Sequence, residues 1–261
     1  MSLLESVKKI VRDAASFMAT DHFEILQKDG PENIVTSSDV AVQKYLCKEL
    51  SQLIEGCGFF CEEEDRHECN AGYVWIIDPI DGTCNFARGI DNCAISVGLR
   101  KGDEIILGVV YSPAREEMYW AEKGCGAFCN GVPIKVSDRP FANALFCTAM
   151  STYRKDLAGV CNDVIMEAYY KCNDVRRFGA ASMEMCFMAR GLIELYFEMR
   201  LQPWDYAAGI LILQEAGGIM TNLDGEHPSW YQNDLVVAAN SPESHAELLR
   251  IVRKHIPTRP Y

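Results

Sequence analysis

Strand-like and helix-like stretches alternate through the second half of the chain, and this alternation constrains the fold more than any other feature of the sequence. Short apolar runs predict strands at 144–150, 174–178, 194–199 and 235–240. Longer stretches with apolar residues at helical spacing predict helices at 156–171, 181–191, 204–218 and 242–255. Because strands that alternate with helices form a sheet covered by helices, we predict an α/β subdomain from about residue 142.

The first half of the chain has a different pattern. An apolar stripe predicts a helix at 3–18, and a second helix opens near Ser37 and Ser38, whose hydroxyls can cap its first turn. Short strands are predicted at 58–61 and 73–77, and an antiparallel meander at 93–100, 104–111 and 117–122. This half is therefore α+β. We predict two layered subdomains, 1–141 and 142–261, that share a cleft.

Composition narrows the class of protein. A chain of 261 residues with 49% hydrophobic and 24% charged residues is typical of a soluble globular protein. No apolar run approaches the ~18 residues of a membrane span, and charged residues interrupt the N-terminus where a signal peptide would be apolar, so we expect a cytoplasmic protein without membrane association. The net charge of −12 argues against direct nucleic-acid binding. An acidic protein can still bind phosphates through metal ions.

The chain has twelve cysteines. They are scattered, lie mostly in apolar surroundings and include no Cys-x-x-Cys pair. This pattern favours reduced, packed thiols over the disulfide framework of a secreted protein.

The stretch WIIDPIDGTCNF at 75–86 places Asp78 and Asp81 directly after an apolar run. A strand that ends at Ile77 would leave both carboxylates at its carboxyl end, where clefts form. Two unit charges about 4 Å apart repel by ~4 kcal/mol at an effective dielectric constant of about 20, so a cation between them is expected. Carboxylate oxygens suit Mg²⁺, Mn²⁺ or Ca²⁺ rather than zinc. In the alternative interpretation, both aspartates only cap a turn that Pro79 and Gly82 shape.

This dodecamer and PWDYAAGILILQEAGG at 203–218 together resemble the paired motifs of the inositol monophosphatase family of lithium-sensitive, Mg²⁺-dependent phosphatases. The resemblance extends over nearly the whole chain, through IVTSSD at 34–39, CEEE at 61–64, GVVYSP at 108–113, GCGAFCNG at 124–131 and VVAANS at 236–241. It implies a layered α-β-α-β-α sandwich of the inositol monophosphatase and fructose-1,6-bisphosphatase type. It also implies two or three Mg²⁺ ions per site, a small phosphate monoester as substrate, and a homodimer.

The resemblance also assigns roles to individual residues. Metal ligands would be Glu63, Asp78, Asp81, Asp205 and the main-chain carbonyl of Ile80. Thr83, paired with Asp39, would help to hold and activate the attacking water, with Glu63 as the third catalytic residue. The N–H groups of Gly82 and Thr83 would hold phosphate oxygens.

Each of these residues also has a structural interpretation. Glu63 lies in an acidic run, which is usually a solvated face. Asp205 could cap a helix, and it could serve as cap and ligand together. Thr83 and Asp39 could be no more than a turn hydroxyl and a helix cap.

The resemblance places the substrate pocket in two segments. Gly179, Ala180 and Ala181 would line it, and Glu198 would accept hydrogen bonds from inositol hydroxyls. Arg200, two residues further along the same strand, could pair with Glu198 or reach a second phosphate, and the pairing is the more economical interpretation.

Three functions follow from these observations, in order of preference. The first is a Mg²⁺-dependent phosphomonoesterase for inositol 1-phosphate or similar polyol phosphates, because Asn85 and Phe86 follow the DGTC stretch as in the inositol branch of the family. The second is a broader sugar phosphatase or fructose-1,6-bisphosphatase. A hypothesis of another class is a regulatory binding protein that associates with the transcription machinery.

Overall fold

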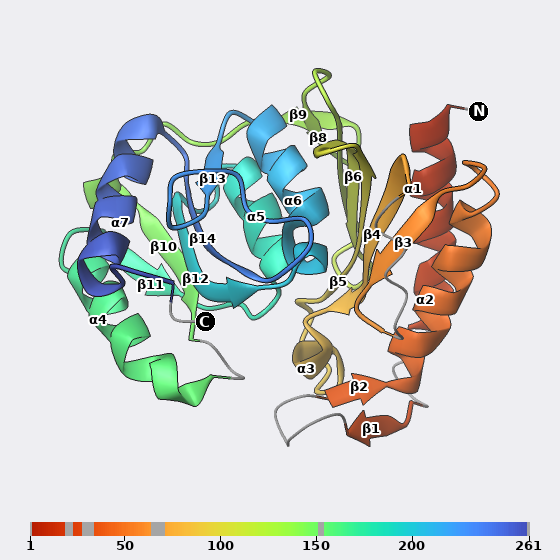
Figure 1. The fold of residues 1–261 in the computed structure, drawn as a ribbon, viewed down its shortest axis with the longest axis horizontal. Coiled ribbons are helices and arrows are strands. Elements are labelled where there is room, and N and C mark those ends of the chain that lie inside the picture. The colour runs from red at the N-terminus through yellow and green to blue at the C-terminus, as the bar shows by residue number, and fades with distance from the viewer. Residues whose placement is uncertain (1, 19–22, 28–33, 64–70, 151–153, 260–261) are drawn as a thin grey trace.

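The computed structural model describes residues 2–18, 23–27, 34–63, 71–150 and 154–259, and these form five layers (Figure 1). Helices α1 (Leu3–Ala14) and α2 (Ser37–Leu50) cover one face of a seven-stranded sheet. Helices α5 (Ala181–Ala189) and α6 (Pro203–Glu215) lie between this sheet and a five-stranded one, whose far face carries α4 (Ala158–Tyr169) and α7 (Pro242–His255). The predicted α-β-α-β-α layering is confirmed.

The seven-stranded sheet runs in chain order from β3 to β9. β3 (Gly58–Cys61) and β4 (Tyr73–Asp81) are parallel, and the remaining neighbours are antiparallel. The predicted meander is present as β5 (Ala94–Lys101), β6 (Glu104–Ser112) and β7 (Glu117–Glu122). The sheet continues through β8 (Ala127–Cys129) and β9 (Val132–Ile134), which the sequence did not predict because three residues are too short for a clear periodicity.

Strand β4 does not end at Ile77 as predicted, because it continues to Asp81. Its pairing with β5 shifts in register between Asp78 and Asp81, and Pro79 lies inside this irregularity. A proline cannot donate to a sheet ladder, so a break in the ladder is where a strand can accommodate it. Asp78 and Asp81 are therefore held by a strand rather than by a loop.

The five-stranded sheet has the order β11-β10-β12-β14-β13. β10 (Leu145–Ala149) is parallel to both β11 (Asp174–Arg176) and β12 (Leu195–Leu201), whereas β14 (Asp234–Ala239) is antiparallel to β12 and to β13 (Ile219–Thr221). Two predicted helices begin or end as single 3-10 turns, at Ala15–Phe17 and Lys155–Leu157. The short β1 (Ile25–Gln27), β2 (Ile34–Thr36) and β13 were not predicted.

Helix α6 packs unusually close to the seven-stranded sheet. Gly98 and Gly108 face each other on β5 and β6, and the backbone of Ala207 and Ala208 lies against them. A Cβ atom added at Gly108 would lie 2.7 Å from the carbonyl oxygen of Ala208. The two glycines therefore set the distance between the sheet and the helix that carries Asp205.

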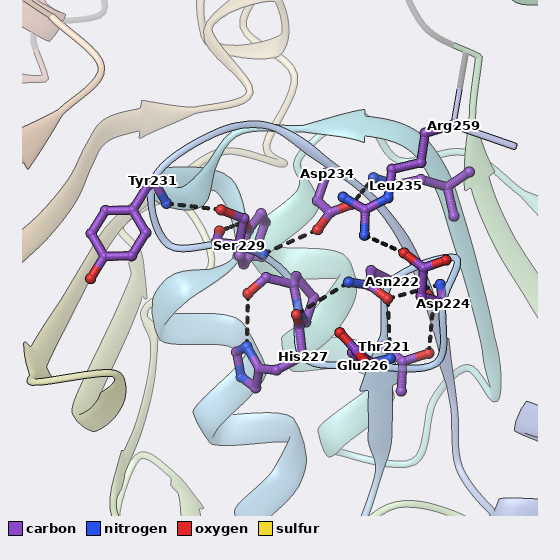
Figure 2. Close-up of polar contacts among 12 residues, drawn as sticks. Thr221, Asn222, Asp224, Glu226, His227, Ser229, Tyr231, Asp234, Leu235 and Arg259 are labelled. Carbon is purple, nitrogen blue, oxygen red and sulfur yellow. Dashed lines mark hydrogen bonds and ion pairs between the residues drawn. The ribbon is translucent and has the colours of Figure 1, made fainter. Parts of the chain in front are cut away.

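The connection between β13 and β14 links the two sheets. Its Trp230 donates to the main-chain oxygen of Asp103, in the turn between β5 and β6, at 2.8 Å. Figure 2 shows how this connection is held at its other end: the buried Asp234 accepts from Ser229 N at 3.1 Å and pairs with Arg259 at 3.3 Å. Arg259 also pairs with Asp224 at 2.7 Å. The hydrogen bond from Trp230 to Asp103 joins the two predicted subdomains, 1–141 and 142–261, and the division between them stays a prediction.

Within the described ranges, no helix is long and apolar enough to cross a membrane. Most of the eleven cysteines in these ranges are buried, and Cys69 lies outside the described residues.

We expect titration of the unfolded protein under non-reducing conditions to report all twelve thiols, because reduced, packed cysteines have no bridge to break. The measurement is the absorbance released by an aromatic disulfide reagent in denaturant. A value lower by two or more thiols, restored by prior reduction, would show disulfides and contradict the cytoplasmic placement.

Candidate active site

A cavity of about 570 Å³ lies where β3, β4 and α3 (Thr83–Phe86) meet the segment before α5, the end of β12 and the start of α6. Six carboxylates line it, contributed by both halves of the chain: Glu62, Asp78, Asp81, Glu184, Glu198 and Asp205. The sequence predicted four of these six. No helix or strand alone supplies the site, so its geometry depends on how the layers pack.

Asp78 has a buried carboxylate oxygen without a hydrogen-bond partner in the described ranges. This oxygen is Oδ1, and the side chain is 2% exposed. Burial, followed by the charges of Glu62, Asp81 and Asp205, raises the pKa of Asp78 well above its ordinary value. A buried carboxylate oxygen without a partner is costly, and a cation would compensate for that cost.

Asp81 connects the strand with the start of α5. Its carboxylate accepts hydrogen bonds from Ala181 N at 3.1 Å, Ser182 N at 2.7 Å and the Ser182 hydroxyl at 2.5 Å. Burial raises its pKa, and these hydrogen bonds oppose that rise. Asp81 therefore fixes the predicted substrate segment 179–181 relative to β4.

Asp205 occupies the first turn of α6, and its Oδ2 accepts from Gln202 N at 2.7 Å in a capping box. Pro203 begins the helix, a position that suits a residue without an N–H group. Burial and the charges of Asp81 and Glu62 raise the pKa of Asp205. The predicted capping role is present, and the same carboxylate lines the cavity.

Glu62 lines the cavity, and Glu63 is not among the lining residues. The structure thus places Glu62, one residue before the predicted Glu63, in the cavity, and the ligand role stays a prediction. Phe60 packs toward α5 and α6 whereas Phe59 and Cys61 pack toward α1 and α2, so the alternation along β3 directs Glu62 to the inner side. Glu63 is 5% exposed, and its main chain is held by Gln43 of α2. The register of the two strands agrees, because Cys61 pairs with Ile77 and the next residues, Glu62 and Asp78, share a face.

Thr83 and Asp39 lie together as predicted. The Thr83 hydroxyl is 3.2 Å from Asp39 Oδ1 and 3.0 Å from the Ile80 carbonyl oxygen. Asp39 is fully buried and also accepts from the Thr36 hydroxyl and main-chain N at 2.5 and 2.8 Å. Burial raises the pKa of Asp39, and its hydrogen bonds oppose that rise.

Gly82 precedes α3 with a φ of +84°, a left-handed conformation that favours glycine. A Cβ atom added there would lie 2.9 Å from the main-chain oxygen of Asn92. The turn therefore needs a glycine, and it directs Gly82 and Thr83 into the cavity.

Three residues that the sequence did not single out as site residues shape the segment 178–180. Glu184 accepts from Phe178 N at 2.9 Å and Gly179 N at 2.8 Å, while Asn85 Nδ2 donates to Phe178 O at 2.8 Å and Asn92 Nδ2 to the same oxygen at 3.3 Å. Gly179, Ala180 and Ala181 line the cavity as predicted. Glu184 was detectable as a lone charge in an apolar helix, because such a group needs partners.

Glu198 and Glu184 are neighbouring acids at the back of the cavity. The buried Tyr196 donates its hydroxyl to Glu198 Oε2 at 2.6 Å. Burial, and then the charge of Glu184, raises the pKa of Glu198 to about 8, and burial raises the pKa of Glu184 to about 7. One oxygen of Glu198 is thus occupied by Tyr196, which leaves the other for a ligand.

Arg200 does not pair with Glu198, so that interpretation was wrong. The pairing of β12 with β14 is irregular between Glu198 and Leu201, and residues two apart share a face only on a regular strand. The side-chain amide of Asn233 is oriented with its oxygen toward the Arg200 guanidinium. This oxygen accepts hydrogen bonds from Arg200 Nη2 at 3.1 Å and Nε at 3.2 Å. Arg88, Arg177 and Arg200 all line the cavity, and none forms an ion pair within the described ranges.

The donor set fits a hard divalent cation. Glu62, Asp78, Asp81 and Asp205 offer carboxylate oxygens, and Asp78 Oδ1 is a buried oxygen without a partner in the described part of the chain. In the same ranges, no three Asp, Glu, His or Cys side chains lie close enough together to bind one metal ion as they stand. Two effects keep the carboxylates apart. Asp81 and Asp205 accept hydrogen bonds from main-chain N–H groups, and the negative charges of the carboxylates repel one another.

Comparisons with known proteins agree with this site. The family model "Inositol monophosphatase family" matches residues 1–257. The chain is 33% identical over 250 residues to an Inositol-1-monophosphatase of Caulobacter vibrioides, which covers 93% of this chain and 97% of the relative. It is 31% identical over 229 residues to the Nus factor SuhB of Salmonella typhimurium, which covers 87% of this chain and 85% of the relative.

A solved structure, the Thermotoga maritima IMPase, superposes with a TM-score of 0.87 at 29% identity and covers 98% of this chain and 99% of its own. The two chains therefore share one fold over nearly their whole length. The chain belongs to the inositol monophosphatase family, a family of phosphatases.

Proposed function

We propose that the chain hydrolyses the phosphate monoester of inositol 1-phosphate, or of a similar polyol, with Mg²⁺. The observation that carries this proposal is the partnerless oxygen of Asp78 among carboxylates from three other elements, a set that a hard cation would complete. The printed name of the Caulobacter relative, Inositol-1-monophosphatase, supports the choice of substrate.

Glu62, Asp78, Asp81, Asp205 and the Ile80 carbonyl would hold two or three Mg²⁺ ions. When bound, such ions neutralise a phosphate ester, lower the pKa of a water molecule and stabilise the departing alkoxide. Because the Thr83 hydroxyl donates to Asp39 or to the Ile80 carbonyl, its oxygen lone pairs are available to accept a hydrogen bond from that water. Asp39 can take the proton that Thr83 passes on. The N–H groups of Gly82 and Thr83 would hold the phosphate oxygens.

A phosphate-release assay tests the proposal. We expect inositol 1-phosphate to be hydrolysed with Mg²⁺ and not after chelation of divalent ions, because without cations the six carboxylates would repel the substrate phosphate. The panel should include fructose 1,6-bisphosphate, adenosine bisphosphate and histidinol phosphate. Equal activity with and without Mg²⁺, or none on any of these substrates, would contradict the proposal.

Glu198→Gln is expected to lower kcat/KM for inositol 1-phosphate by roughly 10- to 150-fold in the presence of Mg²⁺. Tyr196 already donates to one oxygen of Glu198 and a substrate hydroxyl would donate to the other, whereas glutamine has a single acceptor oxygen. Without cations, burial and the charge of Glu184 raise the pKa of Glu198 to about 8. Cations bound beside Asp81 would lower that pKa and favour the ionised form of Glu198. An unchanged kcat/KM would remove Glu198 from the substrate pocket.

The second candidate function is hydrolysis of bisphosphorylated sugars, and the three cavity arginines favour it. A guanidinium is suited to bind a phosphate, and Asn233 holds that of Arg200 in place.

If the substrate carries a second phosphate, Arg200→Ala should lower kcat/KM for fructose 1,6-bisphosphate by roughly 10-fold or more and leave inositol 1-phosphate almost unchanged. Asn233→Ala is the matched control, since it frees the guanidinium without removing it and should have a smaller effect. A wild-type preference for the bisphosphate together with this selective loss would reverse the order of the two functions.

The remaining expectations stay proposals: inhibition by lithium, a homodimer and a cytoplasmic protein. A regulatory role in transcription is supported by names of relatives such as the Nus factor SuhB of Salmonella typhimurium. A variant without phosphatase activity would separate that role from catalysis, because a binding function would remain in the inactive protein.

A further inference from the structure

One face of α2 contacts both Thr83 and the chain at the end of β3. Asp39, Gln43 and Cys47 follow one another at intervals of four residues, so they project from the same side of the helix. Asp39 contacts Thr83, and Cys47 Sγ lies 3.8 Å from Sγ of Cys61, the last residue of β3. Gln43, between these two contacts, binds Glu63, the second residue after Cys61.

Gln43 satisfies both main-chain polar groups of Glu63. Its side chain is 2% exposed; Oε1 accepts from Glu63 N at 2.9 Å, and Nε2 donates to the Glu63 carbonyl oxygen. Buried main-chain groups outside regular structure need such partners. A single primary amide thus fixes the chain where it leaves β3.

Glu62 is held from two sides as a result. Its own N–H group donates to the Ile77 carbonyl oxygen of β4 at 3.2 Å, and the next residue is bound to Gln43. These contacts determine on which side of the chain the Glu62 carboxylate emerges, and that side is the cavity.

We propose that Gln43 is a positioning residue that directs the Glu62 carboxylate into the metal site. The inference rests on the proposed function, since it takes Glu62 to be a cation ligand. Gln43 lines no part of the cavity among the described residues, so it acts only through residues 62 and 63.

The experiment measures Mn²⁺ binding by calorimetry on the whole chain, together with Mg²⁺-dependent kinetics. Gln43→Leu keeps the volume but leaves two buried main-chain groups without partners. We expect the Mn²⁺ dissociation constant to rise 5- to 150-fold, the range to which ~1–3 kcal/mol converts. The Mg²⁺ concentration for half-maximal activity should rise similarly, while the substrate KM at saturating Mg²⁺ changes less than about twofold.

Leu46→Ala is the control for general destabilisation. Leu46 lies on the same helix and is fully buried in the core between the helices α1 and α2 and the seven-stranded sheet. Its truncation should therefore lower the melting temperature at least as much as Gln43→Leu. Its Mn²⁺ constant should stay within about twofold of wild type. If Gln43→Leu does not fold, Gln43→Glu replaces it, because a carboxylate can accept from Glu63 N but cannot donate to its carbonyl.

The outcomes separate the two proposals. A wild-type protein that binds no Mn²⁺ would overturn the proposed function and the inference with it. Normal Mn²⁺ binding by wild type and an unchanged constant in the Gln43 variants would overturn the inference alone. A loss in Leu46→Ala as large as that in Gln43→Leu would also overturn it, because the effect would then reflect stability.

Discussion

Replacing Asp78 with asparagine is expected to abolish Mg²⁺-dependent phosphatase activity and, at the same time, to stabilise the cation-free protein. Asp78 Oδ1 has no protein partner in the described ranges, and burial, followed by neighbouring negative charges, raises the pKa of this group. An amide removes one charge from the cluster, so repulsion falls. The same change removes a ligand, and the loss of several kcal/mol of transition-state stabilisation would lower kcat by about 10²–10⁴-fold.

Thermal unfolding in a chelator and kinetics at saturating Mg²⁺ test both halves of this expectation. Each kcal/mol gained would raise the melting temperature by ~2–4 °C in a chain of this size. Asp224→Asn is a suitable control, because Asp224 is exposed, lies outside the cavity and pairs only at the surface. Near-normal turnover of Asp78→Asn would exclude Asp78 as a ligand, and a lower melting temperature would show that its charge is compensated within the protein.

Glu62→Gln and Glu63→Gln form the second test, with neighbouring residues and identical chemistry. Only the first lies in the cavity, so we expect Glu62→Gln to lower kcat/KM by about 10²–10⁴-fold and Glu63→Gln by less than about threefold. The glutamine at 63 leaves the main-chain groups bound to Gln43 unchanged. The measurement is phosphate release over a range of Mg²⁺ concentrations, with circular dichroism to verify the fold.

The reverse order of effects would restore the assignment made from the sequence and would require the chain after β3 to turn the other way. Equal, small effects would mean that neither glutamate contacts a cation, which leaves three aspartates as ligands.

The layers of the fold were predictable because apolar stretches of helical length alternate with short apolar strands. Asp78 and Asp81 were predictable as a pair because they follow an apolar run and lie beside a proline and a glycine. Asp205 was predictable from its position only as a helix cap, and the family resemblance alone assigned it to the site. The end of β4 was not, because Pro79 resembles a strand terminator and only the register shift against β5 allows the strand to continue.

The other errors have a common origin in local register. Three glutamates in a row at 62–64 offer no difference in composition, and only the inward and outward alternation of β3 separates them. Arg200 was placed beside Glu198 on the assumption of a regular strand, which the irregularity in β12 invalidates. Asn233, its actual partner, is distant in sequence, and no local pattern connects the two.

The facing glycines of β5 and β6 have a consequence for how this enzyme tolerates change. Exchange of a strand glycine for alanine is ordinarily a route to a stiffer, more heat-resistant protein. At Gly98 and Gly108 one added methyl group would lever α6 off the sheet and carry Asp205 with it. Part of the information that specifies the cation site is therefore carried by two residues that have no side chain, and at these positions the usual stabilising exchange would cost both stability and the placement of Asp205.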